Sequence, residues 1–597
     1  MIERRYTVEP LPYTQNVERF APPYIPENFT EEERQYLKPF FSNLDKPVFV
    51  IHHLPEEVIG ALSSRYSRTT DGLRRVFLRE YILPIVNPEQ NKQEWDRLNS
   101  EQRLEALKTK AKFLDLLNFL SMHEGIDYVV NIQRGRKFFD KWLAEYGDDS
   151  ISEMGGVHIA IEGLSNVAVK EIEDKRVGIS PLEKSTRYVS FSDRRPDGNY
   201  LYAVPGELIG TGFESPYRLV ADLLFETYSQ ISGPYLDYIK ECYPKDEDES
   251  ENSFNNSRKA KRSDDLRDLL PFATQTNVAL FGNGRAFEDL INRLMDHPLG
   301  EIRFWGQAIC SELEKVVPSF VRRPKTQRGA EVQIYRTNLK KLREELSRRI
   351  FNGSKTSVRK GWAQLVSFNA KADIDILSSF LFPSASPLTL SEIRRQISEI
   401  SYSDREKMLQ EILKERKFGK ADARREEVRF RKVPRAFENA HYLFEVWARG
   451  GDYRDLHRHR QLTQERQTFG TERGYDLESE VLASPFKIQI VEAIETAGRF
   501  HKIMASENPE VAQYIVPFAY IQHWYMNLSA REIYWMAELR TSPQGRPHYR
   551  TIVQEISRQA KVVSPSIFSD MMVDWGDYSI SRRESEKKRE KKLEVIG

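Results

Sequence analysis

The chain has 597 residues, with 90 Lys and Arg against 89 Asp and Glu, which leaves a formal net charge of +1. A balanced charge gives no general attraction to nucleic acid or acidic membranes, so any anion site must be local. Only Cys242 and Cys310 are present, which excludes a disulfide framework and a cysteine metal cage and favours a reducing compartment. The length exceeds what one hydrophobic core usually supports and predicts several domains.

The hydropathy of the chain predicts no membrane association. The first residues, Met1 to Tyr6, are polar where a secretory signal needs an apolar run. No stretch of about 18 uncharged apolar residues occurs, which a spanning helix would need. We therefore expect a cytoplasmic protein.

The first part of the chain divides into a proline-rich segment and two helical ones. Prolines with fixed φ and no N–H predict an extended surface arm over residues 1–45; they are Pro10, Pro12, Pro22, Pro23 and Pro26. Apolar residues at three-and-four spacing then predict helical structure over residues 55–85 and again over residues 101–122.

Three later segments are dominated by charge. Residues 243–265 form an acidic block followed by a basic one, which predicts a mobile insertion. Residues 331–349 predict a charged helix ended by Asn352-Gly353-Ser354, so residues 331–355 are expected to be a helical linker. Residues 581–597 lack a packing face and predict a frayed helix or tail.

Two parts of the chain resemble each other, which suggests an ancient duplication. Leu270-Pro271 is followed by Asn283, Arg285 and Arg293, and Val516-Pro517 is followed at similar offsets by Ser529, Arg531 and Arg540. Upstream of each lies a block rich in arginine and hydroxyls, at residues 174–188 and 458–475. We therefore expect one repeat over residues 46–330 and a second over residues 356–580.

The sharpest local signal is the segment from Arg454 to Arg460, which contains His457 and His459. Guanidinium groups donate pairs of N–H bonds to phosphate oxygens, and histidine can add a donor. A solvated basic face explains the same composition. The two histidines could also share one face of a strand as metal ligands, but no further ligand stands at a supporting spacing, so no metal is expected.

Two weaker signals accompany this cluster. Ser185 and Arg187 could grip one phosphate together, although Ser-x-Arg is common. Arg267, Arg285 and Arg293 recur near helical spacing, and long cations on one helix face are usually solvent-exposed.

A family resemblance connects these signals. The stretch from Ser152-Glu153-Met154 through Ile161-Glu162-Gly163-Leu164-Ser165 and Asp174-Lys175-Arg176 to Ser185-Thr186-Arg187-Tyr188 resembles the flavin-dependent thymidylate synthases. In the second half, Arg458-His459-Arg460 followed by Thr468 is similar to that family's Arg-His-Arg and serine signature. The chain thus resembles a tandem, double-length relative over most of residues 50–320 and 356–555.

The resemblance implies a fold and a reaction. The fold is α/β, more closely α+β, with two tandem repeats that are helix-rich and carry a small, mostly antiparallel sheet each. The family is a homotetramer with active sites where subunits meet. There FAD lies against the Arg-His-Arg run and mediates reductive methylation of dUMP to dTMP. Methylenetetrahydrofolate supplies the carbon and NADPH the electrons, and no cysteine nucleophile is used.

Residue by residue, the first repeat keeps the nucleotide side of the family's site. The resemblance makes Ser185, Arg187 and Arg267 phosphate or nucleotide ligands and Arg293 the arginine facing the pyrimidine. Flavin contacts are implied for Asn283, Arg285 and Ser67. The Arg-His-Arg run has become Asp174-Lys175-Arg176, so flavin should bind poorly there.

The second repeat keeps the flavin side. The resemblance implies flavin contacts for Arg458, His459, Arg460 and Arg531, and a catalytic role for Arg540. Thr468 replaces the family's serine as a substrate ligand. Gln513 replaces the nucleotide-binding arginine, Ser529 replaces asparagine and Gly470 replaces the Ser-x-Arg arginine, for which Arg473 could substitute.

The complementary losses suggest that two chains form a homodimer that mimics the tetramer, with two composite sites. Three other readings stay open: an inactive homologue that binds flavin or nucleotide as a scaffold, a flavoenzyme for another pyrimidine nucleotide, and a flavoenzyme acting on a base in a polynucleotide. The basic residues 258–262 mildly favour a nucleic-acid partner, but the acidic run before them does not, and we do not expect one.

Overall fold

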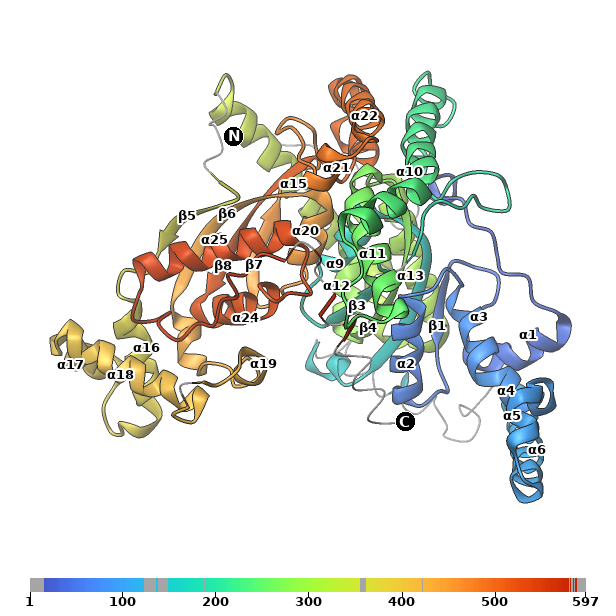
Figure 1. The fold of residues 1–597 in the computed structure, drawn as a ribbon, viewed down its shortest axis with the longest axis horizontal. Coiled ribbons are helices and arrows are strands. Elements are labelled where there is room, and N and C mark those ends of the chain that lie inside the picture. Colours follow the sequence, from blue (N-terminus) through green and yellow to red (C-terminus); the bar gives the residue numbers. More distant parts are fainter. Residues whose placement is uncertain are drawn as a thin grey trace. The chain divides into compact units, whose positions relative to one another are not determined.

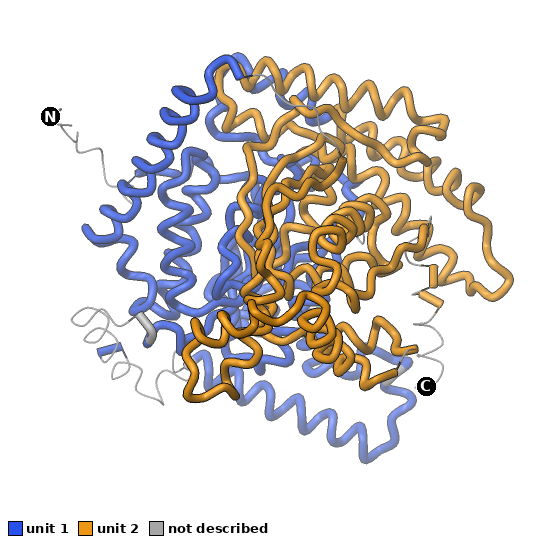
Figure 2. The backbone as a smooth tube through the Cα atoms, turned by 90° about the vertical axis from the view of Figure 1, so that its left-hand side faces the viewer, with its two compact units in different colours: residues 1–222, 272–354 blue, residues 223–271, 355–597 orange. Residues whose placement is uncertain are grey.

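A computed structural model describes residues 15–122, 136–137, 149–186, 189–354, 361–420, 422–578, 580, 583–584 and 586–587. The chain folds into two compact units, shown in two colours in Figure 2. Unit 1 comprises Met1–Asp222 and Phe272–Ser354, and unit 2 comprises Leu223–Pro271 and Lys355–Gly597. The units therefore do not coincide with two contiguous repeats, because residues 223–271 of the first repeat pack with the second.

Each unit is built around a four-stranded antiparallel sheet (Figure 1). The strands of unit 1 are β1 (Val48–Ile51), β2 (Gly156–Ser165), β3 (Ile179–Glu183) and β4 (Gln275–Asn283). Those of unit 2 are β5 (Ala363–Phe368), β6 (His441–Arg449), β7 (Leu462–Arg466) and β8 (Ile521–Ser529). The spatial orders, β1-β2-β4-β3 and β5-β6-β8-β7, are the same. The expected duplication and the expected fold class are therefore confirmed.

The central strand pairs have extended registers. In unit 1, β2 pairs with β4 from Gly156 opposite Asn283 to Ser165 opposite Gln275. This ladder is broken by a bulge between Glu162 and Leu164, where Gly163 has φ +80°. Glycine carries this left-handed conformation without steric cost. In unit 2, β6 pairs with β8 from His441 opposite Ser529 to Arg449 opposite Ile521.

Helices surround both sheets. The α-helices of unit 1 are α1 (Glu31–Leu37), α2 (Glu56–Tyr66), α3 (Leu73–Phe77), α4 (Leu83–Val86), α5 (Lys92–Arg97), α6 (Ser100–Met122), α9 (Asn166–Glu173), α12 (Gly284–Met295), α13 (Gly300–Val316), α14 (Pro318–Val321) and α15 (Gln327–Phe351). The long α10 (Glu214–Cys242) begins in unit 1 and continues into unit 2.

The α-helices that belong wholly to unit 2 are α11 (Glu251–Leu266), α16 (Ala372–Leu381), α17 (Leu390–Glu399), α18 (Tyr402–Lys414), α19 (Arg425–Val428), α20 (Gly450–Leu456), α21 (Ser479–Ala483), α22 (Lys487–Glu507), α23 (Pro509–Ala512), α24 (Ala530–Arg540) and α25 (Pro547–Val563). Short turns of other helix types connect these elements. They are η2 (Glu18–Phe20), η3 (Lys38–Phe40), η4 (Leu78–Ile82, a π-helix), η5 (Pro88–Gln90), η7 (Asp149–Glu153), η8 (Arg267–Leu269), η9 (Arg323–Lys325), η10 (Phe382–Ser384), η11 (Glu415–Lys417), η12 (Arg435–Asn439) and η13 (Gln513–Ile515).

Several predicted helices are confirmed. Residues 55–85 hold α2, α3, η4 and the start of α4, and residues 101–122 lie in α6. The charged segment 331–349 lies in α15, which is followed by Gly353 with φ +78°. This helix is more than a linker, because Gln333 is fully buried and donates to Asn292 of α12 at 3.0 Å.

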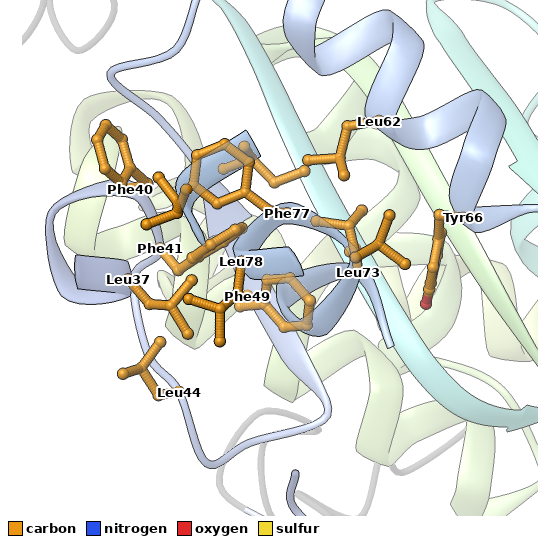
Figure 3. Packing of buried hydrophobic residues seen from close by; sticks show 14 of the residues in the cluster. Leu37, Phe40, Phe41, Leu44, Phe49, Leu62, Tyr66, Leu73, Phe77 and Leu78 are labelled. Carbon is orange, nitrogen blue, oxygen red and sulfur yellow. The ribbon is translucent and has the colours of Figure 1, made fainter. Parts of the chain in front are cut away.

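Part of the proline-rich arm contributes to a hydrophobic cluster in unit 1, which was not expected. Figure 3 shows Leu37, Phe40 and Phe41 packed with Phe49 of β1 and Phe77 of α3. Edge-to-face ring contacts at 5.4–5.6 Å join Phe40 and Phe41 to Phe77. Thr30 starts α1 with a capping box. The prediction of an extended surface arm is therefore wrong for residues 31–41, because α1 and the aromatic residues after it bury apolar area.

The prediction of a mobile insertion over residues 243–265 is also wrong. Residues 251–266 form α11, and the Arg258 guanidinium is fully buried against Glu249. Lys261, nearly buried, pairs with Asp265 and Glu480, both at 2.9 Å. The acidic and basic blocks thus neutralise each other inside unit 2, which a reading by composition alone misses.

Candidate functional site

The two repeats place their site candidates at equivalent positions. The loop after α9 carries Asp174, Lys175 and Arg176, and the loop after α20 carries Arg458, His459 and Arg460. In each repeat a further strand leads into an arginine-bearing helix, α12 or α24. Asn283 caps α12 by accepting from the Ala286 N–H at 2.8 Å, and Ser529 caps α24 by accepting from the Glu532 N–H at 3.2 Å. The exchange of asparagine for serine therefore preserves the cap.

In unit 2, the Arg-His-Arg run alternates between exposed and buried side chains. Arg458 and Arg460 are exposed, whereas His459 is buried. His459 Nδ1 lies 2.6 Å from Glu532 Oε1, and Arg540 Nε donates to His459 Nε2 at 3.1 Å. The structure thus brings His459 and Arg540, two predicted site residues, into direct contact.

The partners of His459 fix its protonation. The Arg540 guanidinium can only donate, so Nε2 must accept, and Glu532 accepts the proton on Nδ1. Burial lowers the pKa of His459; the hydrogen bond to Glu532 opposes this, and the positive Arg540 lowers the pKa further. The imidazole is therefore neutral near pH 7 and protonated on Nδ1.

The remaining candidates of unit 2 lie on the surface or in other contacts. Arg531 pairs with Glu438 at 2.5 Å and donates to the Val433 carbonyl at 3.0 Å. Thr468 and Arg473 are exposed, and Arg473 donates to the Gln467 side chain. The exposed side chains of Thr468 and Arg473 can reach a ligand. The contact between Arg473 and Gln467 does not connect either residue to His459.

In unit 1, the arginine expected to face the pyrimidine is held by acids. Arg293 Nη2 lies 3.2 Å from Asp174 Oδ2 and 3.3 Å from Glu171 Oε2. Lys175, where the second repeat has histidine, pairs with Asp289 at 2.5 Å. The loop after α9 therefore carries an acid, Asp174, at the position where the corresponding loop of unit 2 carries the cation Arg458.

A cavity of about 530 Å³ opens at the start of α12. Two predicted flavin contacts, Asn283 and Arg285, line it, together with Lys175 and with Arg328 of α15. Arg285 pairs with Glu153 at 2.7 Å. Acidic and basic side chains both line the cavity. It therefore differs from the corresponding part of the second repeat, where the cations Arg458 and Arg460 are exposed.

The structure also brings Ser67 and Ser185 together. The Ser185 N–H donates to the Ser67 carbonyl at 2.9 Å, which joins the loop after α2 to the segment after β3. Arg187, the expected partner of Ser185 in phosphate binding, lies outside the described residues.

Arg267, a predicted nucleotide ligand, sits in a buried ionic network of unit 2. Its guanidinium is almost fully buried and lies 3.4 Å from both Asp452 and Asp455. Next to it, Asp268 accepts from Arg546 at 2.7 Å and from Arg449 at 3.3 Å. The first repeat's Leu-Pro block also pairs with the second repeat's Val-Pro block, because Phe518 N–H donates to the Leu270 carbonyl at 2.9 Å. Carboxylates thus hold Arg267, where the resemblance implies a phosphate.

Sequence reasoning missed Glu532 and this network. Glu532 stands three residues after Ser529, in the Ser-x-x-Glu pattern of a capping box, and that pattern was the available signal. The network had no local signal. Among the described residues, no group of three or more His, Cys, Asp or Glu side chains could hold a metal ion. No helix in the described part of the chain is long and apolar enough to cross a membrane.

The fold and the paired sites define a duplicated α+β protein with two related halves. The thymidylate synthase complementing protein family matches residues 120–319 and 391–566, and the chain belongs to that family. This confirms the double-length relationship that the motifs suggest.

Relatives share the double length. The chain is 35% identical over 567 residues to a UPF0159 protein of Chlamydia muridarum, with 94% of this chain and 98% of the relative covered. It is 30% identical over 483 residues to UPF0159 protein Ta1429 of Thermoplasma acidophilum, with 76% and 92% covered. Among solved structures, the UMP/dUMP methylase PolB of Streptomyces cacaoi, bound with 5-Br dUMP, aligns with 35% of this chain and 94% of its own. The two chains are 15% identical over the aligned residues, with a TM-score of 0.27.

Proposed function

We propose that the protein is a flavin-dependent enzyme that methylates dUMP reductively to dTMP, with methylenetetrahydrofolate and NADPH as co-substrates. Membership of the family supports this assignment. The observation that carries it is the arrangement in unit 2, where buried His459 contacts Arg540 and the cations Arg458 and Arg460 flank it at the surface.

These residues suit an anionic dinucleotide such as FAD. Arg458 and Arg460 are exposed on either side of His459 and can donate to a diphosphate. Arg458 and Arg460 would therefore donate to FAD, with Arg531 as a further cation, whereas both ring nitrogens of buried His459 already have partners in Glu532 and Arg540. The bound flavin would supply the hydride, and the protein's own part is to bind, orient and neutralise charge.

We further propose that the sites are composite and that two chains form a homodimer with two of them. In the first repeat, Asp174 stands where a cation would be needed and pairs with Arg293. The cations of the second repeat would complement Ser185 and Arg187 of the first. Arg293 would polarise the uracil once the ligand displaces its carboxylate partners.

A second candidate function follows from the same ion pairs. Arg293 faces Glu171 and Asp174, and Arg267 faces Asp452 and Asp455. Two implied nucleotide ligands therefore already have carboxylate partners, which favours a homologue that binds flavin or a nucleotide without thymidylate synthesis, or one that takes another pyrimidine.

Tritium release separates these candidates. dUMP labelled at the pyrimidine 5-position is incubated with the flavin-loaded protein, methylenetetrahydrofolate and NADPH. Thymidylate synthesis predicts release that depends on both co-substrates. Flavin binding without release from dUMP refutes it and supports the second candidate, and release from labelled UMP alone identifies a changed substrate.

A further inference from the structure

Glu532 occupies a helix-capping position but binds elsewhere. It is the third residue of α24, after the N-cap Ser529, where a glutamate commonly reaches back to the N-cap backbone. Its carboxylate instead lies 2.6 Å from His459 Nδ1 and is almost fully buried. A buried carboxylate that lacks a hydrogen-bond donor destabilises the folded state, so the carboxylate of Glu532 needs the N–H of His459.

The line from Glu532 through His459 to Arg540 permits only one arrangement of protons. If His459 carried its proton on Nε2, two donors would face each other across the 3.1 Å to Arg540 Nε, and two acceptors would face each other at Glu532. If it carried both protons, the clash with Arg540 would remain. With Nδ1 alone protonated, both contacts are hydrogen bonds.

The two repeats support a functional link between Glu532 and His459. At the third position of α12, the first repeat has Ala286 instead of glutamate. In the loop after α9 it has Lys175 instead of histidine, and Lys175 pairs with Asp289. The glutamate and the histidine are thus both present in one repeat and both absent from the other.

We propose that Glu532 is a positioning residue that holds His459 in its Nδ1-protonated form, so that Nε2 orients the Arg540 guanidinium for the pyrimidine nucleotide. This inference rests on the proposed function for the ligand, but the proton arrangement does not. In the described part of the chain, the two terminal nitrogens of Arg540 have no hydrogen-bond partner, and the residue is half-buried. Fixing Nε leaves both terminal nitrogens to grip one ligand group.

Nitrogen-15 NMR of the full chain labelled at histidine tests the proton arrangement without any ligand. His459→Asn assigns the signals. We expect wild-type His459 to show a protonated Nδ1 and an unprotonated Nε2 from pH 7 to pH 8. In Glu532→Gln the amide can donate to Nδ1 as well as accept from it, so the two nitrogen signals should shift toward each other. Unchanged His459 signals in Glu532→Gln would overturn the proposal.

The binding test uses FAD and dUMP as the probes. Glu532→Gln should weaken the binding of dUMP by between about 10-fold and 100-fold, which is the range for losing one charge-assisted hydrogen bond. In a His459→Asn background the same change should cost nothing further, because Glu532 acts through His459. Glu399→Gln, which alters an exposed pair with Arg395, is the matched control.

The outcomes separate the two proposals. An equal loss in the His459→Asn background would overturn the positioning role. Wild-type protein that binds neither FAD nor dUMP would refute the proposed function, whereas the NMR result would still decide the proton arrangement. Wild-type binding that Glu532→Gln leaves unchanged would refute only the positioning role.

Discussion

Asp268→Asn should release residues 223–271 from the rest of unit 2. The Asp268 carboxylate, buried in the first repeat's segment, accepts from Arg546 at 2.7 Å and from Arg449 at 3.3 Å. Removing one partner of a buried ion pair typically costs about 3–5 kcal/mol. Asparagine keeps an acceptor, and Asp452 and Glu478 still face both arginines, so the lower end, about 3 kcal/mol, is expected.

Hydrogen exchange followed by mass spectrometry measures this effect where it occurs. A loss of about 3 kcal/mol corresponds to roughly 100-fold faster exchange for amides of residues 223–271 that open with the segment. The control is Asp404→Asn, which alters an exposed ion pair with Lys407 and should leave the exchange of residues 223–271 unchanged. If Asp268→Asn speeds the exchange of residues 223–271 by less than fivefold, the ionic network does not hold this segment on unit 2.

Three further changes have defined outcomes. Arg293→Ala should lower turnover roughly 100-fold or more while flavin stays bound, because it removes the proposed donor to the substrate; equal loss of flavin in an absorption spectrum would make Arg293 architectural. Burial and the nearby Glu162 raise the pKa of Glu27 to about 7, although Arg74 lowers it. Between about pH 4.5 and pH 7 the folded protein therefore keeps a proton on Glu27 that the unfolded chain has released. The free energy of unfolding should fall as the pH rises through this range. Glu27→Gln should flatten that slope in urea titrations, and an unchanged slope would contradict the assignment. Exposed Cys242 should react with a thiol reagent in the native protein, whereas Cys310, whose pKa burial raises to about 12, should react only after unfolding; two native thiols would contradict this.

Much of the fold could be predicted because its signals are local or repeated. The helices over residues 55–85 and 101–122 follow from apolar spacing, and the common strand order follows from the duplicated motifs. The equivalent caps Asn283 and Ser529 were visible as aligned positions, although their role in starting α12 and α24 was not.

The error over residues 243–265 and the contacts that sequence analysis missed have a common cause: charged residues were interpreted without their ion-pair partners. Residues 243–265 were expected to be mobile because their charges suggested solvation, yet Arg258 and Lys261 are buried in ion pairs. The contact between Asp268 and Arg546 joins residues 278 positions apart. Composition and spacing carry no information about such a pair, and the same holds for Glu532 and His459, 73 positions apart.

Flavin content tests the central claim most directly. Purified wild-type protein should carry one FAD per chain, measured by absorption after release. Arg458→Ala/Arg460→Ala should carry none while its circular dichroism stays that of the wild type. Undiminished FAD in that variant would contradict the assignment of the Arg-His-Arg run as the flavin site.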